Sequence, residues 1–259
     1  MHATTWVFLR GLARQHRHWE DFPEQFRAAF PDSTVLLLDT PGNGDLCHRP
    51  SPTSISGMVA SLRKQLAAHH VQRPVNLLAI SMGAMIAIEW MEQHPEEIER
   101  AVLINTSLRG MSPFSDRLRK ETWPTILKDL LLERDPLIRE QHVLAMSCNL
   151  LANRDALARK WAEYDRQHPT SRVNAVRQLV AGGVYHAPAA RPHEHVLLLQ
   201  SLGDKLVNPV CTTRMAERWR WPLMTHPTAG HDLTLDDGDW VIGRLRKWMQ
   251  EHPLPSNPE

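Results

Sequence analysis

The stretch that most constrains the fold is residues 74–90, which read PVNLLAISMGAMIAIEW. A short, mostly apolar run follows Pro74 and predicts a buried strand over residues 75–80. Beyond Ser81 the chain continues as an Ala-rich apolar segment that is too long for a second strand, so we expect a helix to follow directly. A strand, a one-residue corner and a helix place the Ser81 side chain alone at the edge of a sheet.

Small residues flank this corner. Strand and helix backbones pass very close to each other at such a turn, and the chain has Ala79 and Gly83 two positions to either side of Ser81. A helix that begins at Met82 would aim its free N–H groups at the space above Ser81, where they would stabilise an anionic oxygen. This pattern indicates a nucleophilic serine. The alternative is an ordinary buried corner whose serine only caps the helix. The presence or absence of a histidine and a carboxylate that could act with Ser81 decides between the two interpretations.

The composition of the 259 residues is that of an ordinary globular protein, with 42% hydrophobic and 23% charged residues. A net charge of +1 does not indicate the basic surface that binds nucleic acid or an anionic membrane. The cysteines, Cys47, Cys148 and Cys211, are far apart and in no metal-binding or redox spacing. There is no signal-like N-terminal pattern and no apolar run of about 18 residues. We expect a cytoplasmic monomer or homodimer without nucleic-acid partners or stable membrane association.

Strand-like and helix-like segments alternate along most of the chain. Strands are expected over residues 4–9, 33–39, 75–80, 100–105, 195–200 and 221–226. The segments between them carry apolar residues at helical spacing, and such alternation is typical of right-handed βαβ units. The predicted fold class is therefore α/β, with a doubly wound, mostly parallel sheet.

The alternation stops between residues 108 and 184, which contain no strand candidate. We expect four helices there, near residues 115–134, 135–150, 155–167 and 171–181. The chain then divides into the first part of a core over 1–108, a four-helix lid over 109–185, and the second part of the core over 186–259. A lid at this point would cover the carboxyl ends of the strands, where ligands bind in open α/β sheets.

The lid side chains are harder to interpret. We expect no strongly apolar exposed helix, which argues against action at a lipid interface. Arg117, Arg119 and Lys120 are interpreted as a solvated face. Trp123 and Trp161 either pack in a core or line an acyl pocket. No substrate-binding residue is assigned at this level.

A serine nucleophile needs a histidine to accept its proton and a carboxylate to orient that histidine. Asp204 follows the strand expected over residues 195–200, in a turn that Gly203 permits. His231 lies in the loop after the last expected strand. Both would therefore stand at the same sheet edge as Ser81, and three such residues at three strand ends predict a catalytic triad.

An oxyanion hole needs two backbone N–H donors. One is predicted to be that of Met82, and the other that of Leu12, in the loop after the first strand. Gly11 lets this loop approach the substrate, and we hypothesise that the neighbouring Arg10 favours an acidic group on the substrate. Asp232, in the loop that carries the candidate base, is interpreted as a solvated or helix-capping residue.

Five motifs spread over the core carry a resemblance to a known family: RGL, DTPGNGD, AISMG, GDKLVNP and AGHDL. With them the chain resembles the serine α/β-hydrolases of the small lidded carboxylesterase type, a group that includes C–C-bond hydrolases and cofactor-free haloperoxidases. The resemblance implies the same triad and the same two oxyanion donors. The chain departs from the family pattern at Ala79, which replaces a Gly, at Arg10, which replaces a His, and at Asp45, which replaces a Ser.

The predicted function is hydrolysis of carboxylic esters of small to medium molecules through an acyl-enzyme on Ser81. No cofactor is implied. No metal is expected, because His193 and His195 have no third ligand nearby in sequence, and His16 and His18, at the start of a helix, lack one likewise. An acyltransferase or thioesterase that uses the same triad, and a hydrolase-fold ligand receptor with slow turnover, stay open as alternatives. A serine rather than an aspartate at position 81 disfavours haloalkane dehalogenases and epoxide hydrolases.

Overall fold

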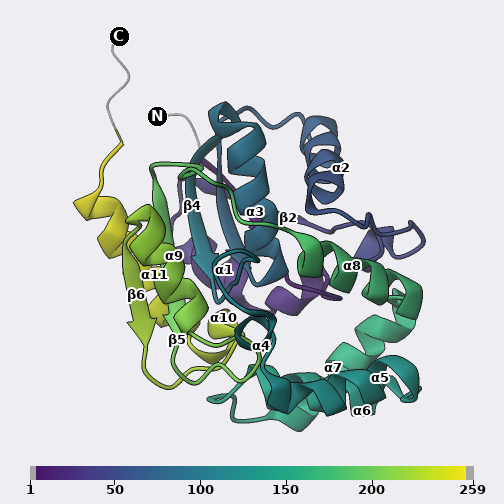
Figure 1. The fold of residues 1–259 in the computed structure, drawn as a ribbon. Coiled ribbons are helices and arrows are strands. Elements are labelled where there is room, and N and C mark those ends of the chain that lie inside the picture. The colour runs from purple at the N-terminus through teal and green to yellow at the C-terminus, as the bar shows by residue number, and fades with distance from the viewer. Residues whose placement is uncertain (1–3, 255–259) are drawn as a thin grey trace.

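A six-stranded parallel sheet forms the centre of the molecule in the computed structural model, which describes residues 4–254 (Figure 1). Its strands are β1 (Thr4–Leu9), β2 (Ser33–Leu38), β3 (Val75–Ile80), β4 (Ile98–Ile104), β5 (Val196–Ser201) and β6 (Leu223–His226). They lie in the order β2-β1-β3-β4-β5-β6, and every pair is parallel. The predicted α/β class with a doubly wound sheet is confirmed.

Helices cover both faces of this sheet. Helices α2 (Ile55–Ala68), α3 (Met82–Gln93) and α9 (Val210–Trp219) pack on one face, and α1 (Phe22–Ala29) and α11 (Gly238–Glu251) on the other. Every residue of β3 and β5 is buried, in keeping with strands that are mostly apolar rather than alternating apolar and polar.

The strand order reverses between β1 and β3. The chain moves outward from β1 to β2, returns to β3, and then continues in the opposite direction to β6. The loops that leave β1 and β3 diverge at such a switch point and open a crevice at the carboxyl ends of the strands. These are the loops that carry Gly11 and Ser81.

Five α-helices occupy the segment between β4 and β5: α4 (Phe114–Arg117), α5 (Trp123–Leu131), α6 (Pro136–Ser147), α7 (Arg154–Gln167) and α8 (Arg172–Val184). Helices α5, α6 and α7 lie together at one end of the molecule (Figure 1). The prediction of a single helix over residues 115–134 is wrong, because α4 and α5 are separate helices. The segment is split because Pro124 fits only the first turn of a helix, so a new helix begins at Trp123.

The lid surface also differs from its prediction, because two of its helices expose apolar side chains. No residue of α5 is buried, and Leu127 and Leu131 are more than half exposed. Helix α8 buries polar side chains, those of Asn174 and Gln178, and exposes apolar ones. The exposed apolar stripe consists of Val173, Val176, Val180 and Val184. In the part of the chain that the structure describes, no helix combines the length and apolar character that crossing a membrane requires.

Candidate active site

Ser81 occupies the one-residue corner between β3 and α3. Its backbone has φ 58° and ψ −120°, a strained conformation that residues other than glycine rarely adopt. The need for a small residue at position 83 has a direct cause, since a Cβ on Gly83 would lie 2.4 Å from the carbonyl oxygen of Leu9. Gly11, two residues further along the same segment, also lies against the corner, where an added Cβ would lie 3.1 Å from Ser81 Cβ. The backbone leaving β1 therefore passes directly against the corner.

Two hydrogen bonds from β4 and its loop hold this corner. The Ser81 N–H donates to the carbonyl oxygen of Ile104 at 2.9 Å, which extends the β3–β4 ladder to the corner itself. The Thr106 hydroxyl donates to the Ser81 carbonyl oxygen at 2.8 Å. With its backbone fixed on both sides, Ser81 presents its side chain to a cavity above the sheet edge.

Asp204 and His231 meet at the carboxyl ends of β5 and β6. His231 Nδ1 lies 2.7 Å from Asp204 Oδ2, and both residues are buried. The other oxygen, Asp204 Oδ1, accepts hydrogen bonds from the N–H groups of Leu206 and Val207 at 2.8 and 2.9 Å, which fixes the carboxylate plane. Burial lowers the pKa of His231, but the charge and hydrogen bond of Asp204 outweigh burial, and the pKa is raised from its ordinary value of 6.5.

Asn105, which sequence reasoning missed, ties the histidine loop to the sheet. Its Nδ2 donates to the carbonyl oxygen of His231 at 2.8 Å and to the Ser201 hydroxyl at 3.1 Å. Its Oδ1 accepts from the Ser201 N–H at 2.8 Å. Asn105 is buried and has a φ of 46°. The only sequence signal was a polar residue directly after the apolar strand β4.

A cavity of about 620 Å³ connects these groups. Ser81, His231, Leu12 and Met82 all line it. Within residues 4–254, the N–H groups of Leu12 and Met82 donate to no protein acceptor, so both are free to bind an oxygen in the cavity. Among the same residues no hydrogen bond joins Ser81 Oγ to His231, and catalytic hydrogen bonds of this kind often tighten only when substrate binds.

Asp232 is not solvated, contrary to its interpretation from sequence. It is 3% exposed and forms a two-point ion pair with Arg10, whose Nη1 lies 3.2 Å from Asp232 Oδ1. Its side chain makes no helix-capping bond to the backbone of α10 (Leu233–Asp236). The pairing balances the charge of Arg10, so the hypothesis that Arg10 attracts an acidic substrate group loses its basis.

Further side chains of the helical segment between β4 and β5 reach the site. Arg117 is 8% exposed and lines the cavity, so its interpretation as part of a solvated face is wrong. Arg119 is half-buried and donates to the carbonyl oxygen of Asp204 at 3.0 Å. Trp123 and Trp161 both line the cavity, and Trp161 also packs in a core with Leu144 and Ala158, so it combines the two roles left open for it. Lys120 is exposed, as expected.

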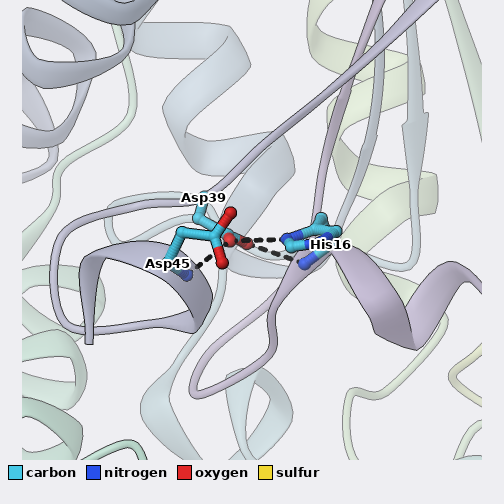
Figure 2. Close-up of side chains that lie close together, drawn as sticks. All are labelled: His16, Asp39 and Asp45. Carbon is cyan, nitrogen blue, oxygen red and sulfur yellow. Dashed lines mark hydrogen bonds and ion pairs between the residues drawn. The ribbon is translucent and has the colours of Figure 1, made fainter. Parts of the chain in front are cut away.

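A cluster of residue types that bind metals lies in the loops that follow β1 and β2, apart from the proposed triad. Figure 2 shows its members, His16, Asp39 and Asp45, close together. Asp39 Oδ1 accepts from the His16 N–H at 2.7 Å, and Oδ2 lies 2.7 Å from His16 Nδ1 and 3.2 Å from the Asp45 nitrogen. These hydrogen bonds engage both oxygens of Asp39. The cluster therefore holds the loop that follows β1 against the loop that follows β2.

Comparisons with known proteins agree with this architecture. Residues 6–244 match the model described as "Alpha/beta hydrolase family". The Yersinia enterocolitica protein named "Putative carbamate hydrolase RutD" is 24% identical over 255 residues, which are 95% of this chain and 87% of that protein. The pimeloyl-[acyl-carrier protein] methyl ester esterase of Chromobacterium violaceum is 32% identical over 118 residues, 46% of this chain and 40% of its own length.

A solved structure shares the fold over nearly the whole chain. The enol-lactonase of Burkholderia xenovorans LB400 superposes with a TM-score of 0.75 at 17% identity, covering 96% of this chain and 92% of its own. At this identity the likeness shows the fold, while the family match and the relatives support hydrolase activity. The chain belongs to the α/β hydrolase family.

Proposed function

We propose that this protein hydrolyses carboxylic esters of small to medium molecules through an acyl-enzyme on Ser81. The observation that carries the proposal is His231, which a buried hydrogen bond to Asp204 orients and which lines the same cavity as the strained Ser81 corner. A histidine oriented in this way is suited to accept the proton of a serine. The two free N–H groups on the same cavity supply the electrostatic part of the reaction.

The proposed reaction has two matched halves. Ser81 Oγ attacks the ester carbonyl carbon while His231 Nε2 takes the hydroxyl proton, and the carbonyl oxygen becomes an anion bound by the N–H groups of Leu12 and Met82. The C–O bond to the alcohol then breaks, and His231 gives its proton to the departing oxygen. A water molecule attacks the acyl-enzyme by the same route, which releases the acid and restores Ser81.

The surroundings of His231 favour this cycle. Asp204 stabilises the protonated ring that forms in each half, and its two backbone partners keep it from rotating away. The cavity volume of about 620 Å³ is in the range of small-molecule sites. Among the relatives, the Chromobacterium violaceum protein is named as a methyl ester esterase, which is the same reaction type.

Hydrolysis of a p-nitrophenyl ester series of increasing acyl length, by wild type and by Ser81→Ala, tests the proposal. Ser107→Ala is the matched control, because Ser107 is a buried serine on the same cavity and its hydroxyl has no hydrogen-bond partner within residues 4–254. We expect activity to be lost in Ser81→Ala and kept in Ser107→Ala. The acyl length of the best substrate would measure the usable depth of the cavity.

Labelling with a serine-reactive phosphonate separates two kinds of failure. Labelled Ser81 in an enzyme inert toward every ester would keep the nucleophile and reject ester hydrolysis, and thioesters would be assayed next. Absence of label on Ser81 in the folded wild type, located by mass spectrometry, would overturn the proposal as a whole.

A further inference from the structure

One charged side chain of the cavity lacks a carboxylate partner although it is buried. Arg117, the last residue of α4, is 8% exposed and lines the cavity that holds Ser81. No acidic group lies within ion-pair distance of its guanidinium among residues 4–254. Burying an unpaired charge is costly, so a protein rarely keeps one without a use for it.

The other cavity arginines show the contrast. Arg10 is paired with Asp232, Arg14 with Glu140, and Arg139 with Asp165. A fourth, Arg172, also binds only backbone carbonyls, those of Leu131 and Glu133. Its side chain is partly exposed, however, so water solvates its charge. Arg117 combines burial with an unbalanced charge.

The hydrogen bonds of Arg117 leave part of its donor capacity unused. Its Nη1 donates to the carbonyl oxygen of Gly183 at 3.1 Å and its Nη2 to that of Gly182 at 2.6 Å. Its buried Nε has no hydrogen-bond partner in the part of the chain that the structure describes. A guanidinium has five N–H donors, and the two carbonyls, at the C-terminal end of α8, carry only partial negative charge. Burial lowers the pKa of Arg117 from its ordinary value of 12.5, yet a guanidinium stays charged at neutral pH.

We propose that Arg117 anchors a carboxylate of the substrate, so that the preferred esters carry a free carboxylate remote from the reacting carbonyl. This inference rests on the proposed function and names its substrate class. A carboxylate matches the planar guanidinium with two parallel hydrogen bonds and one compensating charge. A phosphate dianion would exceed that charge and would face the negative end of α8, formed by the Gly182 and Gly183 carbonyls.

The kinetic test compares methyl esters of succinic, glutaric and adipic acids, in which the second carboxyl is either free or converted to a primary amide. We expect wild type to prefer the free acids. Arg117→Gln should raise KM for the acids about tenfold to a hundredfold, the value of one charge-assisted contact. It should leave kcat for the acids, and both kcat and KM for the amides, unchanged. Arg117→Lys, which keeps the charge, should restore part of the preference.

Arg172→Gln is the matched control, since it makes the same chemical change at a second cavity arginine held by backbone carbonyls. It should leave the ratio of kcat/KM for the acids to kcat/KM for the amides unchanged. Equal losses on acids and amides in Arg117→Gln would mean that Arg117 only holds the end of α8, and would overturn the inference. A wild type that hydrolyses acids and amides equally well would overturn it too.

A binding measurement keeps this inference separate from the proposed reaction. Calorimetric titration of Ser81→Ala with methyl hydrogen adipate and with its amide needs no turnover. Tighter binding of the acid that disappears in Ser81→Ala/Arg117→Gln supports the carboxylate anchor even if no ester is hydrolysed. Titration with methyl phosphate forms the second arm, and tighter binding of the phosphate would overturn the choice of carboxylate.

Discussion

Arg10 and Asp232 form a buried ion pair across 222 residues of sequence. Arg10 precedes Gly11 in the loop that presents the Leu12 N–H, and Asp232 follows His231. The Arg10 guanidinium also lies 4.7 Å from the centroid of the Trp19 ring. The pair therefore joins the loop of the candidate oxyanion donor to the loop of the candidate base, and fixes their spacing from outside the reacting atoms.

Asp232→Asn should destabilise the protein strongly, because it leaves the Arg10 charge buried and uncompensated. Removing one partner of such a pair costs about 3–5 kcal/mol in the free energy of unfolding. Urea denaturation measures this, with Glu24→Gln as the control, whose ion pair with Arg27 is exposed and should contribute less than about 1 kcal/mol. Equal small changes in both variants would show that the buried pair does not hold these loops.

Activity should depend on pH through His231. Its raised pKa means that the ring keeps its proton to a pH above 6.5, and a protonated ring cannot act as base. We therefore expect kcat/KM to fall as pH decreases through a value above 6.5. Asp204→Asn removes the charge that raises this pKa, so it should shift the acid limb to lower pH and reduce kcat by roughly 10³–10⁴-fold. An unmoved acid limb in Asp204→Asn would assign the titration to another group.

Asn105→Ala should lower kcat more than it raises KM. The change frees the His231 carbonyl and leaves buried groups of Ser201 unpaired, so the histidine loop shifts while the cavity walls stay in place. A displacement of this kind costs about tenfold to a hundredfold in kcat. Asn153→Ala, which removes a helix cap on α7 far along the lid, should reduce stability without this kinetic effect. Matching kcat losses in both would refute a positioning role for Asn105.

Glu97 should make the fold sensitive to acid. Burial raises the pKa of Glu97, but hydrogen bonds from Arg63 and Trp90 and the charge of Arg73 outweigh it and lower the pKa to about 2. The unfolded chain then binds the proton first as pH falls, so this contribution to stability is complete above pH 4.5 and lost toward about pH 2.

Thermal unfolding of wild type and Glu97→Gln across this pH range measures the effect. The variant should be less stable at neutral pH, and the difference should shrink as pH falls through the acid range. The neighbouring Glu96 is exposed, so Glu96→Gln should follow wild type at every pH. A constant difference between Glu97→Gln and wild type would contradict the prediction.

The sequence by itself determined the strands, most helices and the parallel doubly wound sheet. Apolar periodicity is a local property, and the mostly apolar run at 75–80 predicted a buried strand, which the fully buried β3 confirms. The sequence also predicted the corner at Ser81, because the close backbone approach there requires small residues, and Ala79 and Gly83 are small. Local turn chemistry likewise placed Asp204 and His231 at strand ends. Their roles in catalysis are predictions that the experiments above decide.

Only the tertiary structure decided which side chains meet. From sequence, Arg117 is interpreted as solvated and Asp232 as solvated or helix-capping, yet their partners lie 65–66 and 222 residues away. Asn105 bonds to residues 96–126 positions further along the chain. Helix α8 turns polar side chains inward because Asn174 satisfies backbone groups of a distant loop. Parallel strands gather loops from across the chain at one edge, so the charge and hydrogen-bond partners found there have no signature in local sequence.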